Sequence, residues 1–196
     1  EDHAINACLY TIEMHEKLSE LQKDWAKRGF PKAYARAGIN TAKVVVGCIG
    51  STKVQMNFTC LGDGVNLASR LEGANKEYGT LYMCSDATYQ KAKSRIRGRF
   101  LDFLAVKGKK EPVKVHEIIC EIGKEPPGLN EKIALYDKAI ALHLERKWDE
   151  AIATFEGLLA KWPDDGPSQT YIKRCHEYKE NPPPAEWDGS YHLTHK

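Results

Sequence analysis

The first stretch of the chain carries an apolar residue at about every third or fourth position. This spacing is the period of one face of an α-helix, and Gly29 with Pro31 marks the end of the pattern. The pattern therefore predicts one long amphipathic helix over residues 4–28. Its apolar positions are Ile5, Cys8, Leu9, Ile12, Leu18, Leu21 and Trp25.

Runs of β-favouring residues and short helical patterns alternate from there to residue 120. They predict strands at 33–40, 43–49, 54–61, 81–84, 97–106 and 112–120, and helices at 65–76 and 86–92. Such alternation indicates an α/β or α+β sandwich of modest size.

Local features predict how some of these elements connect. Thr41 and Ala42 are expected to join the first two strands in a hairpin-like turn. The consecutive valines 44–46 predict a strand that is covered on both faces. Gly79 is expected to end the first short helix, and Ser85 is expected to cap the second.

The chemistry of the sequence changes after a cluster of helix breakers at 125–128, which we interpret as a domain boundary. Residues 125–180 show the patterns of three further helices and resemble one and a half tetratricopeptide (TPR) units. Arrays of such units usually need about three repeats to be stable alone, so this extension is expected to pack on something else. Residues 181–196, rich in proline and polar residues, predict an extended tail.

Charge and cysteine content narrow the class of protein. The 29 basic and 27 acidic side chains leave a net charge of +2, and no aromatic stripe lies between basic residues, so a nucleic-acid partner is disfavoured. The six cysteines form no CxxC pair, which argues against a zinc site or a disulfide framework and favours a cytoplasmic setting. No apolar run approaches the roughly 18 residues of a membrane span, and the chain does not begin with Met. We therefore expect an internal piece of a longer protein, and any membrane anchor would lie upstream.

The strongest functional signal is a series of short motifs in a fixed order. They are Gly38-Ile39-Asn40-Thr41, Val44-Val45-Val46-Gly47, Gly50-Ser51, Gly62-Asp63-Gly64-Val65-Asn66-Leu67-Ala68-Ser69-Arg70-Leu71-Glu72, Tyr78-Gly79-Thr80 and Val106-Lys107-Gly108-Lys109. Each string alone is a weak signal, but their order and spacing together are specific. Over roughly residues 2–120 the chain resembles the class III adenylate and guanylate cyclase catalytic domain.

The resemblance implies an α+β fold, the ferredoxin-like nucleotidyl cyclase sandwich, with residues 1–124 as its C-terminal part and the N-terminal strands missing. Residues 125–180 then form a TPR-like helical hairpin behind it. The end of the chain, with Pro182-Pro183-Pro184 and Trp187-Asp188-Gly189, resembles that of bacterial CHASE2-type cyclases, which carry an extracellular sensor and transmembrane helices upstream. The parent protein is therefore expected to be membrane-anchored, with this part in the cytoplasm.

Asn66 and Arg70 are the candidate catalytic residues. Four residues apart on one helix, they project from the same face, while Leu67, Ala68 and Leu71 are expected to anchor the opposite side. Asn offers a donor and an acceptor, and Arg offers a fixed cationic fork for a phosphate. The resemblance implies that Asn66 orients the ribose and that Arg70 stabilises charge on the α-phosphate as the 3′-hydroxyl attacks. Without the flanking motif, the pair would be read as an ordinary exposed helix face.

Two further residues are candidate substrate contacts. The resemblance places Thr59 at the family's base-selecting position, where a threonine is typical of an adenylate-cyclase subset. Thr is also simply a good strand residue, and both interpretations stay open. Lys107 lies in a basic turn whose family counterpart contacts the terminal phosphates of the nucleotide; an exposed turn without a ligand is the alternative.

Metal ligands are not expected in this chain. The resemblance implies two Mg²⁺ or Mn²⁺ ions held by two aspartates that precede the first residue, and it also places a lysine that helps select adenine upstream. Asp63 is expected to serve the helix N-terminus instead, and the seven histidines show no ligand spacing. Because charge neutralisation by metal would be absent, the fragment alone is expected to be inactive. Because strands of the central sheet would also be missing, the apolar residues 44–46 are expected to be exposed at a sheet edge.

Two hypotheses about function follow. In the first, the parent is an adenylate cyclase that forms cyclic AMP and pyrophosphate from ATP, with GTP as the alternative substrate. It would work as a homodimer with the site at the subunit boundary. In the second, the domain is a degenerate cyclase kept as a structural or regulatory subunit. The second is favoured by the absent metal site and by Ala42, which occupies a usual glycine position and strains the turn if a positive φ is required.

Overall fold

The computed structural model describes residues 2–51, 55–105 and 112–191. Along the chain the elements are α1 (His3–Lys27), β1 (Ala37–Ile39), β2 (Val45–Ser51), β3 (Gln55–Leu61), α2 (Asp63–Tyr78), β4 (Tyr82–Ser85), α3 (Asp86–Ala92), β5 (Ile96–Leu104), β6 (Val113–Glu121), α4 (Leu129–Leu144), α5 (Trp148–Leu159) and α6 (Gly166–Glu180). The predicted helices are confirmed, and the six predicted strands each have a counterpart, although the first is much shorter than expected.

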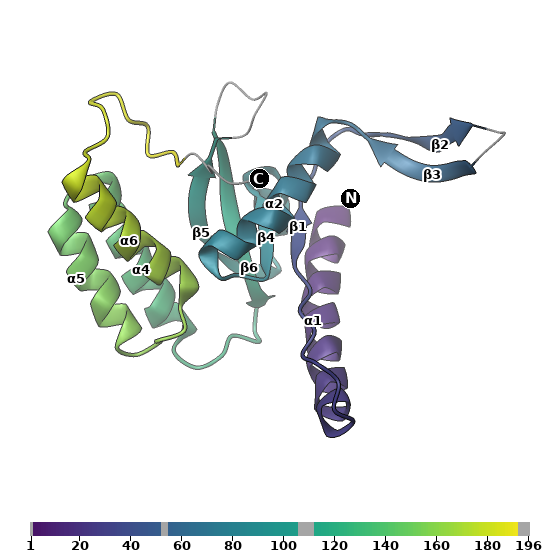
Figure 1. Cartoon of the computed structure of the whole chain (residues 1–196), viewed down its shortest axis with the longest axis horizontal. Coiled ribbons are helices and arrows are strands. Elements are labelled where there is room, and N and C mark those ends of the chain that lie inside the picture. Colours follow the sequence, from purple (N-terminus) through teal and green to yellow (C-terminus); the bar gives the residue numbers. More distant parts are fainter. Residues whose placement is uncertain (1, 52–54, 106–111, 192–196) are drawn as a thin grey trace.

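A mixed sheet with the order β1-β4-β6-β5 forms the centre of the molecule (Figure 1). β1 runs parallel to β4, and the other pairs are antiparallel. Successive side chains of β4 point to opposite faces. Met83 packs with Leu71 and Tyr78 of α2 on one face, whereas Tyr82 and Cys84 pack with α1 and α3 on the other. The sheet is therefore a layer between α2 and the α1–α3 pair.

The predicted hairpin between the first two strands is wrong. β1 pairs with β4, in the register Ala37↔Tyr82, while β2 pairs with β3 in a separate two-stranded sheet. The reason lies in the close packing of β1 on α2. A Cβ at Gly38 would overlap the backbone of α2 at Ala68 and Glu72, so only a glycine permits this approach. The contact holds β1 in the main sheet, and the chain leaves that sheet at Asn40.

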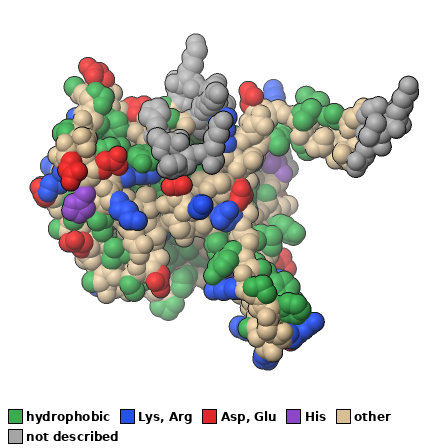
Figure 2. All heavy atoms as spheres, in the orientation of Figure 1, with side chains coloured by type: hydrophobic (Ala, Val, Ile, Leu, Met, Phe, Trp, Pro, Cys, Tyr) green, Lys and Arg blue, Asp and Glu red, His purple; other side chains and the backbone are tan. Residues whose placement is uncertain are grey.

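The ribbon of β2 and β3 projects away from the rest of the molecule (Figure 1). Val45 is 70% exposed and Phe58 is 76% exposed, and Figure 2 shows hydrophobic side chains on this ribbon. The prediction that 44–46 are covered on both faces is therefore wrong for the described part of the chain. Their exposure agrees instead with the other expectation, that residues 44–46 are exposed at a strand edge.

Three local predictions have definite outcomes. Gly79 ends α2 in the left-handed conformation, at φ 62°, as predicted. Ser85 occupies the N-cap position of α3, but its hydroxyl does not cap the helix, because it donates instead to Asn40 Oδ1 at 2.7 Å. Among the described non-glycine residues only Arg146 has a positive φ. Ala42 therefore does not strain the turn. All six cysteines are free thiols.

The helices α4, α5 and α6 form a compact extension on the side of the sheet opposite the ribbon (Figure 1). Their core contains Tyr136, Phe155 and Tyr171. The extension packs on the sheet through the fully buried pair of Arg99 and Asp165, joined by two hydrogen bonds of 2.7 and 3.1 Å. The expectation that it packs on something else is thus confirmed, whereas its TPR-like character stays a prediction.

Asp165 is held as a carboxylate in this interface. Burial would raise the pKa of Asp165, but the hydrogen bonds and charge of Arg99, together with Lys132 and Ser168, lower it to about 2. A buried charge is stable only when paired and hydrogen-bonded. Asp165 meets this condition and also caps α6, where it accepts from the backbone N–H of Ser168.

The same extension contains a buried, neutral histidine that predicts a pH dependence of stability. His143 lies among the rings of Tyr171, Tyr178, Trp148 and Trp187, with Cys175 Sγ 3.2 Å from its Nδ1. Burial, with a smaller effect of Arg174, lowers the pKa of His143 to about 3. An unfolded histidine titrates near 6.5, so on acidification the unfolded state takes up the proton first and stability falls.

We expect the burial of neutral His143 to lower the free energy of unfolding by about 2 kcal/mol when the pH falls from about 7 to about 5. The variant His143→Gln removes the titrating group, and urea unfolding at both pH values measures the difference. The wild type should lose more stability than the variant. An equal loss in both proteins would show that His143 is not buried in its neutral form.

Candidate active site

The helix α2 presents Asn66 and Arg70 on its solvent-exposed side. Leu67 and Leu71, on the other side, are 7% and 0% exposed and pack on the sheet. Three- and four-residue spacing therefore separates the two faces as the sequence predicts. The structure places the amide and the guanidinium on the surface, where a ligand can reach both.

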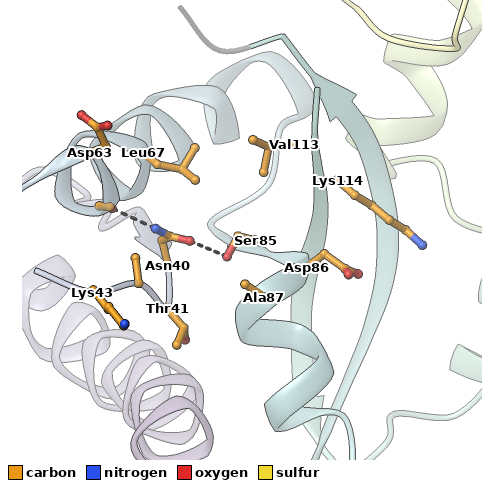
Figure 3. A pocket seen from close by; sticks show the side chains of 12 residues that line it. Asn40, Thr41, Lys43, Asp63, Leu67, Ser85, Asp86, Ala87, Val113 and Lys114 are labelled. Atoms are coloured by element: carbon orange, nitrogen blue, oxygen red, sulfur yellow. Dashed lines mark hydrogen bonds between the residues drawn. The ribbon is translucent and has the colours of Figure 1, made fainter. Parts of the chain in front are cut away.

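The start of α2 is held in place by a polar cluster around Asn40. Its side-chain amide donates to the carbonyl oxygen of Gly64 at 3.0 Å, and its oxygen accepts from the Ser85 hydroxyl. Next to it, the hydroxyls of Thr41 and Thr88 are 3.0 Å apart. Asn40 thus links the end of β1 to the first turn of α2 and to the start of α3 (Figure 3). In the sequence Asn40 stands within the motif Gly38-Ile39-Asn40-Thr41, and the signal for its linking role is a polar residue directly after a strand.

A cavity of about 470 Å³ lies beside this cluster (Figure 3). Its lining residues are Asn40, Thr41, Ala42, Lys43, Asp63, Gly64, Leu67, Ser85, Asp86, Ala87, Val113 and Lys114. The cavity is therefore bordered by the first turns of α2 and α3 and by the start of β6. Of the predicted site residues in the described ranges, Asn66, Arg70 and Thr59 are not among those that line it.

Asp86 at the rim of the cavity is paired with His116. The Nε2 of the histidine and a carboxylate oxygen of Asp86 are 2.7 Å apart. Burial lowers the pKa of His116 although Asp86 opposes this shift. The pKa of Asp86 is also lowered: burial would raise it, but hydrogen bonds from Gln90 and His116 outweigh that effect. We therefore assign a neutral histidine that donates its Nε2–H to an ionised aspartate, which makes this pair a structural link between α3 and β6.

The other predicted residues lie elsewhere. Thr59 is half-buried on the β2–β3 ribbon opposite Gly47, so within one chain it stands on a different element from Asn66 and Arg70. Lys107 lies outside the described residues. Asp63, by contrast, lines the cavity and is in the first turn of α2, the position expected for a residue that serves the helix N-terminus.

No group of three or more His, Cys, Asp or Glu in the described ranges could hold a metal ion. Within the same ranges, no helix has the length and apolar character required to cross a membrane.

Comparisons with known proteins decide the family. The family model for the adenylate and guanylate cyclase catalytic domain matches residues 1–119. The chain belongs to the class III nucleotidyl cyclase family. The matched segment runs from α1 into β6 and stops short of α4, so the helical extension lies outside the matched segment.

Individual relatives agree with this assignment to the cyclases. Adenylate cyclase 1 of Rhizobium meliloti is 35% identical over 117 residues, which are 60% of this chain and 17% of that protein. The terminal-differentiation specific adenylate cyclase of Dictyostelium discoideum is 33% identical over 176 residues, 88% of this chain and 8% of that protein. Its match is long enough to enter the helical extension. The chain therefore spans less than a fifth of the length of both relatives.

The fold of this cyclase chain also has a counterpart among solved structures. The adenylyl cyclase CyaB of P. aeruginosa superposes with a TM-score of 0.53 at 33% identity, over 60% of this chain and 59% of that one. The likeness supports the α+β cyclase architecture of the first part of the chain.

Proposed function

We propose that this chain is part of an adenylate cyclase that converts ATP to cyclic AMP and pyrophosphate. The observation that carries the proposal is the exposed face of α2, where Asn66 and Arg70 stand side by side in a chain that belongs to the cyclase family. The ribose 3′-oxygen attacks the α-phosphorus, a P–O bond to that oxygen forms, the bond to the β-phosphate oxygen breaks, and the 3′-hydroxyl proton passes to solvent or a base.

Each residue has a stated role in this proposal. Asn66 hydrogen-bonds the ribose and fixes the direction of attack. The guanidinium of Arg70 stabilises the negative charge that accumulates at the α-phosphate in the transition state. Lys107 neutralises the terminal phosphates, and Thr59 contacts the purine edge. GTP is the alternative substrate.

The site is proposed to lie between two protomers of a homodimer. Within one chain Thr59 stands on the projecting ribbon rather than beside Asn66 and Arg70, and the described residues contain no group of three or more His, Cys, Asp or Glu that could hold a metal ion. The exposed apolar side chains of the ribbon supply surface for a second protomer. Mg²⁺ or Mn²⁺ would be held by carboxylates outside the described residues, and the chain alone would be inactive.

The complete protein, given ATP with Mg²⁺ or Mn²⁺, should form cyclic AMP and pyrophosphate in equal amounts. A degenerate cyclase acting as a regulatory subunit is the second candidate, supported by the lack of a metal-binding cluster in the described ranges. It predicts nucleotide-independent association with a partner and no cyclic product from ATP or GTP. Absence of product with both nucleotides would reject the first candidate.

Replacing Thr59 tests how the base is selected. Thr59→Val keeps the shape of the side chain but removes the hydroxyl, so the complete protein should lose about tenfold in its ratio of kcat/KM for ATP over GTP. Thr154→Val, on the distant α5, is a matched control because its hydroxyl bonds only the local Glu150 carbonyl. An unchanged ratio in Thr59→Val would reject the base-reading role.

A further inference from the structure

The helical extension touches α2 at the C-terminal end of that helix. The Thr170 hydroxyl on α6 donates to the carbonyl oxygen of Glu77 at 2.8 Å. Arg174, one turn further along α6, donates to the Tyr78 hydroxyl at 2.9 Å. Gly166 lies so close that a Cβ there would overlap the Tyr78 carbonyl. The last turn of α2 is therefore fixed by side chains and backbone of α6.

The central group of this contact is the guanidinium of Arg174, whose side chain is 5% exposed. It donates to the Asp102 carboxylate on β5 at 2.5 Å, and the Tyr78 hydroxyl donates to the same carboxylate at 2.5 Å. The ring of Tyr191 covers the guanidinium at 3.6 Å. One arginine thus joins α2, β5 and the C-terminal stretch in a closed polar network.

Such a network restricts geometry more than it adds stability. Buried ion pairs contribute little net stability because desolvation offsets their attraction. A planar guanidinium, however, satisfies its partners only in a narrow range of positions. The network therefore fixes where Tyr78 can lie relative to β5.

A fixed Tyr78 also fixes the exposed face of α2. Arg70 lies eight residues before Tyr78, about 12 Å along the helix axis. The middle of the helix rests on β1, where Gly38 lies so close to the backbone of Ala68 and Glu72 that a Cβ there would overlap it. With this support in the middle, any displacement at the Tyr78 end changes the direction in which Asn66 and Arg70 point.

We propose that Arg174 is a positioning residue for the cyclase reaction. It contacts no substrate and acts through Tyr78, so that α6 holds α2 at the angle at which Asn66 and Arg70 meet the nucleotide. The inference rests on the proposed function and assigns the helical extension a part in the active site. If the extension is only a structural support, the network stabilises the fold without affecting turnover of folded protein.

The test compares variants of the complete protein at a temperature where all of them are folded. Tyr78→Phe removes the shared hydroxyl and leaves the Arg174–Asp102 pair intact, and Arg174→Gln removes the guanidinium. Both should lower kcat about tenfold or more, because small misplacements of catalytic groups cost up to about a hundredfold, while KM changes little.

Two control variants separate positioning from support. Tyr171→Phe breaks a bond from the same helix to the Leu101 carbonyl on β5 (2.7 Å) and keeps the ring that lies beside the Arg174 guanidinium. Lys173→Gln removes a charge from the exposed side of α6. Both controls should keep the wild-type kcat. The proposal is overturned if folded Tyr78→Phe and Arg174→Gln keep full kcat, or if Tyr171→Phe loses as much kcat as they do.

Hydrogen exchange provides a readout that needs no cyclase activity. The amides of residues 66–78 should exchange faster in Tyr78→Phe and Arg174→Gln than in the wild type and in Tyr171→Phe. Unchanged exchange in α2 would overturn the positioning role whatever the activity. If the wild type forms no cyclic nucleotide but exchange in α2 changes as expected, the result supports the role of Arg174 and Tyr78 in fixing α2 and rejects the proposed function.

Discussion

Arg70→Ala should lower kcat of the complete protein by about 10²- to 10³-fold, as expected when one group that stabilises transition-state charge is lost. KM for ATP should change little, because the guanidinium acts mainly on charge that develops during the attack. Arg70 is exposed on α2 and is not among the buried residues of the core cluster that contains Leu67 and Leu71. The variant should therefore keep its thermal stability and the oligomeric state of the wild type, measured by thermal unfolding and by sedimentation.

The matched control is Lys76→Ala, which removes an exposed cation from the same helix. Because Lys76 lies six residues after Arg70, it points from a different side of α2. Its kcat should equal that of the wild type. Full activity of Arg70→Ala, or an equal loss in Lys76→Ala, would remove Arg70 from the mechanism.

Gly38→Ala should destabilise the protein strongly, because the added Cβ would overlap the backbone of α2 at Ala68 and Glu72. Backbone atoms within a helix cannot move aside locally, so β1 and α2 must separate. Overpacking of this kind costs about 3 kcal/mol, which is about 6–12 °C in Tm for a protein of this size. Turnover should fall as well, since β1 supports the helix that carries Asn66 and Arg70.

Gly73→Ala, at the residue directly after Glu72 in α2, should have the opposite effect. A Cβ at this position would meet no atom within 4 Å, and alanine favours a helix over glycine by about 1 kcal/mol. Thermal unfolding of the two variants side by side provides the measurement. An unaffected Tm in Gly38→Ala would mean that β1 and α2 are not in close contact.

The sequence predicted those features that depend on local periodicity. Leu67 and Leu71 recur at the helical spacing, so the face opposite Asn66 and Arg70 could be assigned without coordinates. Gly79 ends α2 because a left-handed residue is required there. The family could also be recognised, because motifs such as the one around Asn66 are contiguous in the chain.

Features that depend on distant residues were missed. The turn at Thr41 and Ala42 suggested a hairpin because neighbouring strands often pair, but the contact of Gly38 with α2 moves β1 to the main sheet. The bond between Arg174 and Tyr78 spans 96 residues, and no local pattern indicates such a partner. The cluster around Asn40 was missed for the same reason. The role of Lys107 stays a prediction.

The central claim is that the exposed face of α2 meets the nucleotide, and the structure of the complete protein with a non-cyclisable ATP analogue measures this directly. The account predicts the Arg70 guanidinium at about 2.7–2.9 Å from an oxygen of the α-phosphate, with Asn66 at the ribose and a second protomer on the other side of the nucleotide. A nucleotide bound away from α2, with Arg70 paired only within its own protomer, would contradict it.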